Sequence, residues 1–263
     1  MLYEDEQSFA KTLAKRAGQI MSDAFARGVS REWKEDGTPL TFADTTINKL
    51  VIDAVSQTYP EDGVWGEEES IQLDAERLWV CDPVDGTMPF SHGLPISSFS
   101  LALVVDGRPV VGVVYDPFMD RLFSAVVGAG AFMNEEPIHV SAQETLENAL
   151  IDVEGLPVGS DPAVNAKDTL IRTINNTGAH TTHYWSVILP TALVAAGQFT
   201  AAIFGVTKPE DAAAVKVIVE EAGGTVTDLF GNEQRYDGKI KGYIASNGLV
   251  HQQLVDIIKD QTQ

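Results

Sequence analysis

Two aspartates that follow directly on an apolar strand are the residues in this sequence most suited to chemistry. The segment from Trp79 to Pro95 reads WVCDPVDGTMPFSHGLP: an apolar run ends at Asp82, the chain turns at a proline, and Asp85 follows three residues later. Two anions so close at a buried strand end repel each other, and placing them there is costly unless a cation lies between them. Hard divalent cations such as Mg²⁺ take oxygen ligands of this kind. The segment therefore predicts a metal site, with an ordinary Asp-Pro turn as the alternative.

A small turn follows this pair of carboxylates. Gly86 permits close backbone approach and Thr87 adds a hydroxyl, so backbone N–H groups at these two residues are suited to hold a phosphate. The whole segment resembles the signature of the inositol monophosphatase family, whose members are Mg²⁺-dependent, lithium-sensitive phosphatases. The residues that carry the resemblance are Asp82 to Thr87, the preceding Trp79-Val80, and the following Phe90, His92, Gly93 and Pro95.

Two segments earlier in the chain match the same family. After Gly66, three consecutive glutamates stand where the family has Gly-Glu-Glu, and the resemblance makes Glu67 a metal ligand that helps to activate water. Without the resemblance, such a run is typical of a solvated loop. A Thr-x-x-Asp segment ends at Asp44, and the resemblance implies that Asp44 orients Thr87 by a hydrogen bond. Asp44 is also a suitable N-cap for the helix that follows it.

A third acidic segment lies far along the chain, from Lys208 to Ala214. It reads KPEDAAA where the family has Trp-Asp-x-Ala-Ala, so the resemblance makes Asp211 the last metal ligand, while Glu210 replaces the tryptophan. A proline followed by acidic residues is also ordinary at a helix start. The metal ligands that the resemblance implies are Glu67, Asp82, the carbonyl oxygen of Val84, Asp85 and Asp211.

The resemblance implies hydrolysis of a phosphomonoester by a water that the metal site activates. We expect two or three Mg²⁺ ions, with Mn²⁺ as a substitute and Li⁺ as an inhibitor. Glu67 and Thr87 would orient the water, Asp44 would support Thr87, and Gly86 and Thr87 would hold the phosphate. No covalent phosphoenzyme is needed. The expected substrate is a small polyol, sugar or inositol phosphate.

The residues expected near the substrate differ from those of inositol phosphatases. Phe204 stands where those enzymes carry a glutamate that contacts ring hydroxyls, and Tyr184 and Trp185 stand among the bulky residues of a segment that is small-residue-rich in the family. Both differences argue against myo-inositol phosphate itself. The residues that we expect to contact the substrate are His183, Phe204 and Lys208.

Several other functions stay open. Within enzymes, the alternatives are a histidinol-phosphate phosphatase and a 3′(2′),5′-bisphosphate nucleotidase, although the region after Asp152 is short of the basic groups that a second phosphate needs. A regulatory protein that kept the phosphatase fold is a non-enzyme alternative, and an acidic Ca²⁺-binding scaffold is another. The intact set of acidic residues favours catalysis over both.

The elements that position these residues follow from apolar periodicity and turn signals. Helices are predicted over 4–27, after Asp44, from Asp161 to Asn176, and over 189–197, 209–223 and 247–260. Strands are predicted over 64–65, 78–81, 98–106, 110–115, 121–127, 137–141, 149–153, 179–187, 199–205, 225–229 and 241–245. The first half reads as an antiparallel meander and the second as strand–helix alternation.

This pattern and the resemblance together predict a mixed α+β and α/β fold, a layered αβαβα sandwich as in the sugar phosphatase (inositol monophosphatase/fructose bisphosphatase) fold. We expect an N-terminal α+β half, residues 1–143, which carries the antiparallel sheet and most metal ligands. The C-terminal α/β half, residues 144–263, supplies the last ligand and the substrate pocket.

The composition of the chain limits which partners and which cellular location we expect. The chain has 263 residues and a formal net charge of −20, which repels nucleic acid and anionic membranes, and repels a phosphorylated substrate unless cations are bound. No apolar run is long enough for a membrane span, and the acidic N-terminus lacks the pattern of a signal peptide. Cys81 is the one cysteine, and we expect it to be buried and inert. We expect a cytoplasmic protein and, from the family, a homodimer.

Overall fold

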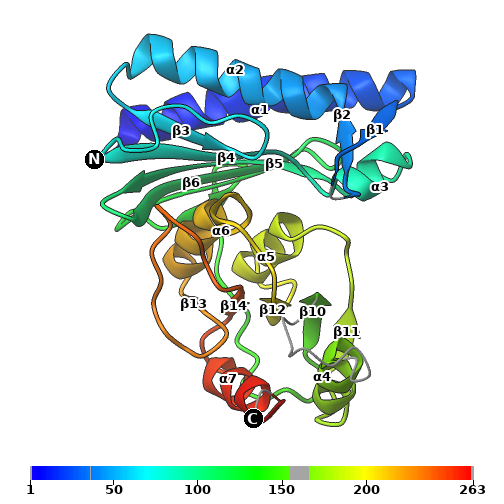
Figure 1. The fold of residues 1–263 in the computed structure, drawn as a ribbon. Coiled ribbons are helices and arrows are strands. Elements are labelled where there is room, and N and C mark those ends of the chain that lie inside the picture. Colours follow the sequence, from blue (N-terminus) through cyan, green and yellow to red (C-terminus); the bar gives the residue numbers. More distant parts are fainter. Residues whose placement is uncertain (1, 36, 155–165, 262–263) are drawn as a thin grey trace.

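Helices and sheets alternate in stacked layers (Figure 1). The computed structural model describes residues 2–35, 37–154 and 166–261. Helices α1 (Glu4–Arg27) and α2 (Phe42–Thr58) cover the outer face of a seven-stranded sheet, and α5 (Ile188–Ala195) and α6 (Pro209–Glu221) lie between this sheet and a five-stranded one. Helices α4 (Ala166–Asn175) and α7 (His251–Gln261) cover the far face of the five-stranded sheet. The predicted layered αβαβα sandwich is confirmed.

The seven-stranded sheet is antiparallel except for its first pair, β3 and β4, which run parallel. Its strand order is the chain order, as expected of a meander. The strands are β3 (Gly63–Gly66), β4 (Arg77–Asp85), β5 (Ser98–Val105), β6 (Arg108–Asp116), β7 (Arg121–Val126), β8 (Ala131–Met133) and β9 (Glu136–Pro137). Strands β4 and β5 lie in the interior of the sheet and are apolar along most of their length, because helices cover both of their faces.

The five-stranded sheet has the order β11-β10-β12-β14-β13, with β10 parallel to both of its neighbours and β14 antiparallel to β12 and β13. Its strands are β10 (Leu150–Glu154), β11 (His180–Thr182), β12 (Ala201–Phe204), β13 (Thr225–Thr227) and β14 (Tyr243–Ser246). The parallel pairs are joined through helices, as parallel strands require. The predicted helix start at Asp161 lies outside the described residues, and the described part of this helix begins at Ala166.

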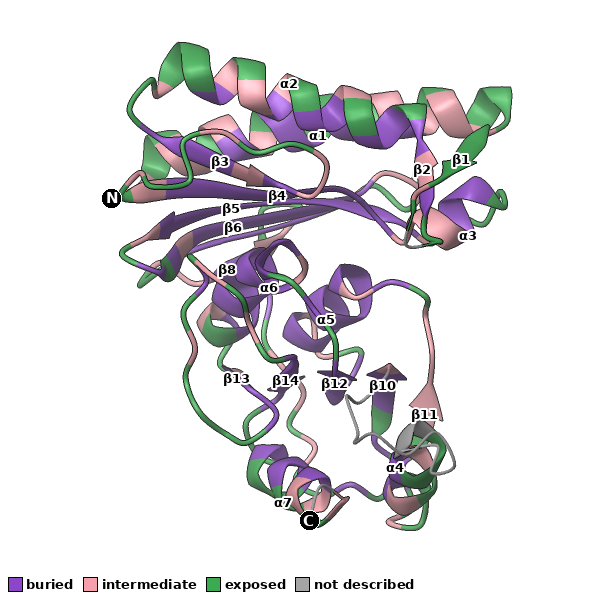
Figure 2. Ribbon diagram, viewed as in Figure 1, coloured by how far each residue is buried: buried purple, intermediate pink, exposed green. Residues whose placement is uncertain are grey.

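The two middle helices are buried on nearly every side (Figure 2). All eight residues of α5 are buried, and α6 buries ten of its thirteen residues. An apolar helix of this kind is stable only inside a core, and here it has a sheet on either face. Helix α6 packs against β5 and β6 of the first sheet as well as β13 and β14 of the second, so it joins the two predicted halves. The division of the chain into residues 1–143 and 144–263 stays a prediction.

Helix α2 begins differently from the prediction. Asp44 was expected as the N-cap, but the cap is Thr41, whose side chain accepts a hydrogen bond from the N–H of Ala43. Asp44 is the third helical residue, and its carboxylate accepts from the N–H of Thr41 at 2.7 Å. The two side chains therefore form a capping box.

Two predicted strands are shorter than expected, and one hairpin was missed. The strand predicted over 179–187 ends at Thr182, and the one predicted over 137–141 is β9 alone, because the N–H of Val140 bonds to Ala222 instead of to a neighbouring strand. Strands β1 (Arg31–Trp33) and β2 (Pro39–Thr41) form an antiparallel hairpin where no strand was predicted. Within the described residues, no helix is long and apolar enough to cross a membrane.

Candidate functional site

The two aspartates of the central motif lie at the end of β4, where the ladder to β5 is interrupted. Asp82 pairs with Ser100 and Asp85 with Ser98, and the register shifts between them, because Pro83 has no N–H to donate to the ladder. The N–H of Val84 instead donates to Asp82 Oδ1 at 3.0 Å. The shift leaves two carboxylates that are only 3 % and 4 % exposed on one short turn.

One pocket of about 280 Å³ brings the predicted site residues together. Its lining includes Glu67, Asp82, Val84, Asp85, Gly86, Thr87 and Asp211, and the remaining lining residues are Thr38, Pro39, Met88, Glu154, Trp185, Ser186 and Val187. The predicted site residues among them come from the turn at the end of β4, the loop after β3 and the start of α6, and the others include the start of β2, the end of β10 and the segment before α5. Larger pockets of about 370 and 380 Å³ lie elsewhere, and their described linings contain none of the predicted metal ligands.

The pocket concentrates negative charge on carboxylates, of which Asp82 and Asp85 are almost fully buried. Burial raises the pKa of Asp82 well above its usual value, and repulsion from Glu67 and Asp85 raises it further. Burial likewise raises the pKa of Asp211, although the N–H of Lys208 donates to its carboxylate at 2.6 Å and partly offsets the effect. Carboxylates with raised pKa values in one pocket are stabilised by any cation that enters it.

Helix α6 positions Asp211 in the way that α2 positions Asp44. Pro209 is the first helical residue, a position where its missing N–H costs nothing, and Asp211 accepts the N–H of Lys208 from the third helical position. The carboxylate is therefore fixed at the helix N-terminus, which favours negative charge. The capping pattern that makes an ordinary helix start also delivers a carboxylate to the pocket.

Asp85 is held by the segment that leads into α5. Its carboxylate accepts hydrogen bonds from the hydroxyl of Ser186, from the N–H of Val187 at 2.8 Å, and from the hydroxyl of Ser98 at 3.1 Å. The N–H groups of Ile188 and Leu189 lie at 3.3 and 3.4 Å. Burial raises the pKa of Asp85 and these donors oppose the rise. No local pattern in the sequence predicts this contact between Asp85 and the segment before α5.

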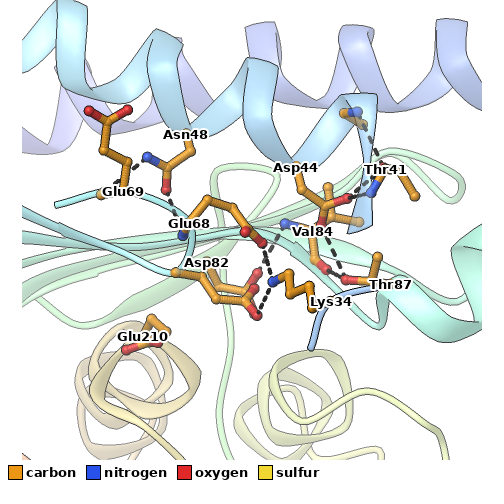
Figure 3. Close-up of polar contacts among 12 residues, drawn as sticks. Lys34, Thr41, Asp44, Asn48, Glu68, Glu69, Asp82, Val84, Thr87 and Glu210 are labelled. Carbon is orange, nitrogen blue, oxygen red and sulfur yellow. Dashed lines mark hydrogen bonds and ion pairs between the residues drawn. The ribbon is translucent and has the colours of Figure 1, made fainter. Parts of the chain in front are cut away.

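Two lysines approach Glu67. Lys34 Nζ lies 2.5 Å from Glu68 Oε1 (Figure 3) and 3.3 Å from Glu67 Oε1. Lys208 Nζ lies 3.9 Å from Glu67 Oε1. Asn48 of α2 secures this loop, because its side chain accepts the N–H of Glu68 and donates to the carbonyl of Glu69. Sequence reasoning missed Lys34, whose only signal was its place at the start of a polar stretch.

Thr87 contacts Asp44, as the resemblance implied. Thr87 Oγ1 lies 3.2 Å from Asp44 Oδ1 and 2.9 Å from the carbonyl oxygen of Val84 (Figure 3). Burial raises the pKa of Asp44 to about 6, and its hydrogen bonds with Thr41 oppose the rise. The hydroxyl is thereby fixed between the first turn of α2 and the end of β4. That Thr87 and Asp44 act in catalysis stays a prediction.

Glu210 lies on the first turn of α6, on the same side of the site as Asp82 (Figure 3). Its side chain is 3 % exposed, and its Oε2 atom has no hydrogen-bond partner among the described residues. Lys208 Nζ lies 3.7 Å from Oε1. Burial raises the pKa of Glu210, and its charge in turn raises the pKa of Asp82 and Asp211. The residue that departs from the family pattern therefore adds another buried carboxylate.

The residues expected to contact the substrate lie in different places. Phe204 is 1 % exposed in β12, its ring packs 5.2 Å from that of Tyr243, and it does not line the pocket, so this position does not support the predicted contact with substrate. His183 also lies outside the lining, but its ring is 4.8 Å from that of Trp185, which does line it. Lys208 has a side chain 62 % exposed and reaches Glu67 from outside the pocket.

The donor set suits a hard divalent cation, although the side chains do not enclose one as they stand. Every predicted ligand offers oxygen, the ligand chemistry that Mg²⁺ prefers. Among the described residues, however, no group of three or more His, Cys, Asp or Glu side chains is arranged so that it could hold a metal ion. Asp85 is directed to Ser186 and Glu67 to Lys34. The predicted metal site therefore requires these two carboxylates to turn into the pocket.

Comparison of the chain with known proteins identifies its family. The model of the inositol monophosphatase family matches residues 3–263. The chain belongs to the inositol monophosphatase family. A histidinol-phosphatase of Chlorobaculum parvum is 34 % identical to this family member over 95 % of each chain, and a fructose-1,6-bisphosphatase/inositol-1-monophosphatase of Thermotoga maritima is 32 % identical over 97 % of this chain and 96 % of its own.

A solved structure agrees as well. The inositol monophosphatase TM1415 of Thermotoga maritima superposes with a TM-score of 0.87 at 31 % identity, covering 98 % of each chain. The fold and the phosphatase class are therefore those of the inositol monophosphatase family. The relatives are named for different substrates, so their names leave the substrate of this chain open.

Proposed function

We propose that this protein is a divalent-metal-dependent phosphomonoesterase that acts on a small phosphorylated metabolite. The observation that carries the proposal is the single pocket in which Glu67, Asp82, Asp85 and Asp211 meet Thr87 in a chain of this family. Glu67, Asp82, Asp85, Asp211 and the Val84 carbonyl would hold the cations. A divalent cation in such a site supplies Lewis acidity, which neutralises phosphate charge and makes a nucleophile available from water at neutral pH.

Side-chain and backbone groups of the protein would orient the water and the phosphate. Thr87 Oγ1, fixed between Asp44 and the carbonyl oxygen of Val84, is placed to hydrogen-bond a water inside the pocket. The backbone N–H groups at Gly86 and Thr87 would hold the phosphate, because Gly86, at φ 76°, turns the chain sharply at the pocket wall. Asp85 would then exchange some of its contacts with the α5 segment for the cation.

A monophosphate is favoured over a bisphosphate. Neither lysine nor arginine appears in the described lining of the pocket, and a second phosphate needs cationic partners. Lys34 and Lys208, the cations nearby, are already paired with glutamates. This argues against the bisphosphate nucleotidase alternative and leaves polyol, sugar, inositol and histidinol monophosphates as candidates.

A phosphate-release screen tests the proposal. The panel holds inositol 1-phosphate, histidinol phosphate, fructose 1,6-bisphosphate, glycerol 2-phosphate and phosphoadenosine phosphate, each with Mg²⁺ and with a chelator. We expect Mg²⁺-dependent release from at least one monophosphate, and we expect Asp85→Asn to lower turnover about a hundredfold or more. Release that persists in the chelator, or an Asp85→Asn protein with near-normal activity, contradicts the proposal.

A further inference from the structure

Trp185 is a large aromatic residue in a backbone conformation that such residues avoid. Its φ is 58°, in the left-handed region, and its side chain is 57 % exposed. A bulky residue at positive φ is a true outlier, and it persists only where the surrounding structure holds it there. Trp185 also lines the acidic pocket. The strain therefore lies at the wall of the proposed active site.

The residues around Trp185 fix its position. The next two residues, Ser186 and Val187, bond to the carboxylate of Asp85, and the Trp185 carbonyl packs so closely on Gly86 that an added Cβ there would lie 3.3 Å from it. The ring of His183 lies 4.8 Å from the indole. The backbone of Trp185 is therefore held against the central turn, and its indole lies beside an imidazole.

Tyr184 and Trp185 are neighbours in sequence but face different surroundings. The ring of Tyr184 packs edge-on against Phe199 at 5.7 Å, at the margin of the core, so its role is packing. Trp185 makes no such core contact among the described residues and remains half open at the pocket. The left-handed turn is what directs the two aromatic side chains apart.

The lining of the pocket is divided by chemistry. The acidic lining residues are Glu67, Asp82, Asp85, Glu154 and Asp211, whereas Pro39, Met88 and Trp185 supply apolar surface. A polyol is recognised by paired hydrogen bonds to its hydroxyls, which apolar surface does not provide. A flat ring gains from stacking on an indole without needing such partners.

We propose that Trp185 is a substrate-binding residue that selects phosphomonoesters whose alcohol carries a flat nitrogen heterocycle, over polyol phosphates of similar size. The phosphate enters the acidic part of the pocket and the ring stacks on the indole. This inference rests on the proposed phosphatase function and narrows its substrate class.

The test compares each of two ring-bearing esters with one polyol phosphate. We measure kcat/KM with Mg²⁺ for histidinol phosphate, which carries an imidazole, and for a nucleoside 5′-monophosphate, and divide each by the value for glycerol 2-phosphate. We expect the wild type to favour at least one ring-bearing ester, and we expect Trp185→Ala to lower that ratio about tenfold, with Trp185→Phe restoring most of it. Trp185→Gly, which suits a φ of 58°, gives the same loss if Ala is poorly tolerated.

Trp33 provides a matched control, because its side chain is also 57 % exposed but does not line the pocket. Trp33→Ala should leave the ratio unchanged. A wild type that prefers glycerol 2-phosphate, or a Trp185→Gly protein that is active with an unchanged ratio, overturns the inference while the phosphatase proposal stands. If no ester is hydrolysed, the phosphatase proposal fails, and calorimetric titration of wild type and Trp185→Gly with the same esters then decides whether the indole binds the ring.

Discussion

Asp82 is a buried carboxylate that faces other carboxylates, so its charge opposes folding when no cation is present. Its pKa is raised by burial first and by Glu67 and Asp85 next. We therefore expect Asp82→Asn to raise the melting temperature in chelator, since the variant removes the repelling charge and keeps the shape of the side chain. The same change should abolish the rise in melting temperature that Mg²⁺ produces in the wild type. Thermal unfolding with and without Mg²⁺ measures both effects.

Glu210 adds a further negative charge beside Asp82, and its effect on cation binding can be tested separately. Because its Oε2 is buried without a partner beside Asp82 and Asp211, its charge should strengthen the attraction for a divalent cation. We expect Glu210→Gln to weaken Mn²⁺ or Mg²⁺ binding several-fold in calorimetric titration. Glu69→Gln, which changes an exposed carboxylate on the nearby loop, is the control and should leave the affinity unchanged. Equal affinities for wild type and Glu210→Gln would count against a role for Glu210 in cation binding.

Residue identity alone predicted part of this site. Asp82 and Asp85 stand out because two carboxylates end an apolar strand, and that local signal needs no fold. Lys34 and Ser186 carry no such signal, since each matters only because the fold brings it to a carboxylate. Phe204 shows the converse: a matching position in a motif suggested contact, but β12 turns its ring into the core.

At the scale of elements, the cap of α2 links stability to the site. Thr41 caps the helix and bonds to Asp44, which in turn contacts Thr87. We expect Thr41→Val to lower the free energy of unfolding by about 1 kcal/mol through loss of the cap. Urea unfolding measures it. Thr45→Val removes a hydroxyl from the same helix at an exposed position and should cost clearly less; equal losses from the two variants would show that the cap contributes nothing special.

His251, the first residue of α7, makes a pH-sensitive contact with the second sheet. Its ring lies 2.9 Å from Ser246 Oγ and 2.9 Å from Thr227 Oγ1, and burial, with a smaller effect from Lys216, lowers its pKa. The folded protein therefore binds this proton less readily than the unfolded chain, so stability falls as the pH drops below the usual histidine pKa of about 6.5.

The prediction is a difference between two proteins. Between pH 7.5 and 5.5, we expect the wild type to lose more free energy of unfolding than His251→Gln, which cannot take up the proton. Denaturant unfolding at the two pH values, with ionic strength held constant, gives the comparison. If the two proteins lose the same free energy of unfolding, His251 is not a source of the pH dependence.

Elements with strong periodicity were predicted best. Helix α1 has the predicted bounds, because apolar residues recur at helical spacing along 24 residues. The hairpin of β1 and β2 was missed, since three exposed residues in β1 show no alternation. The strand predicted through 187 ends early because Ser186 and Val187 bond to Asp85, a long-range contact that no local pattern contains.

On the scale of the whole molecule, the pocket is built from residues of the seven-stranded sheet and of a helix that lies between the two sheets. Asp82 and Asp85 come from β4 of the seven-stranded sheet, whereas Asp211 comes from α6, which lies between the sheets. The layered arrangement itself followed from the alternation of strands and helices together with the family resemblance. The convergence of Asp211 with the other acidic residues did not follow from spacing, because more than a hundred residues lie between Asp85 and Asp211.

From this convergence we expect a divalent cation to stabilise the entire fold. The chain carries a net charge of −20, and several of its carboxylates are buried together. A cation in the pocket would relieve the repulsion between the carboxylates of β4 and that of Asp211 on α6. A ligand that binds only the folded state at a hundred times its Kd adds about 2.7 kcal/mol. We expect Mg²⁺ to raise the melting temperature well beyond Na⁺ at equal ionic strength, and Asp82→Asn combined with Asp211→Asn to remove the difference. If Na⁺ stabilises equally, the effect is general screening of surface charge and the pocket holds no specific cation.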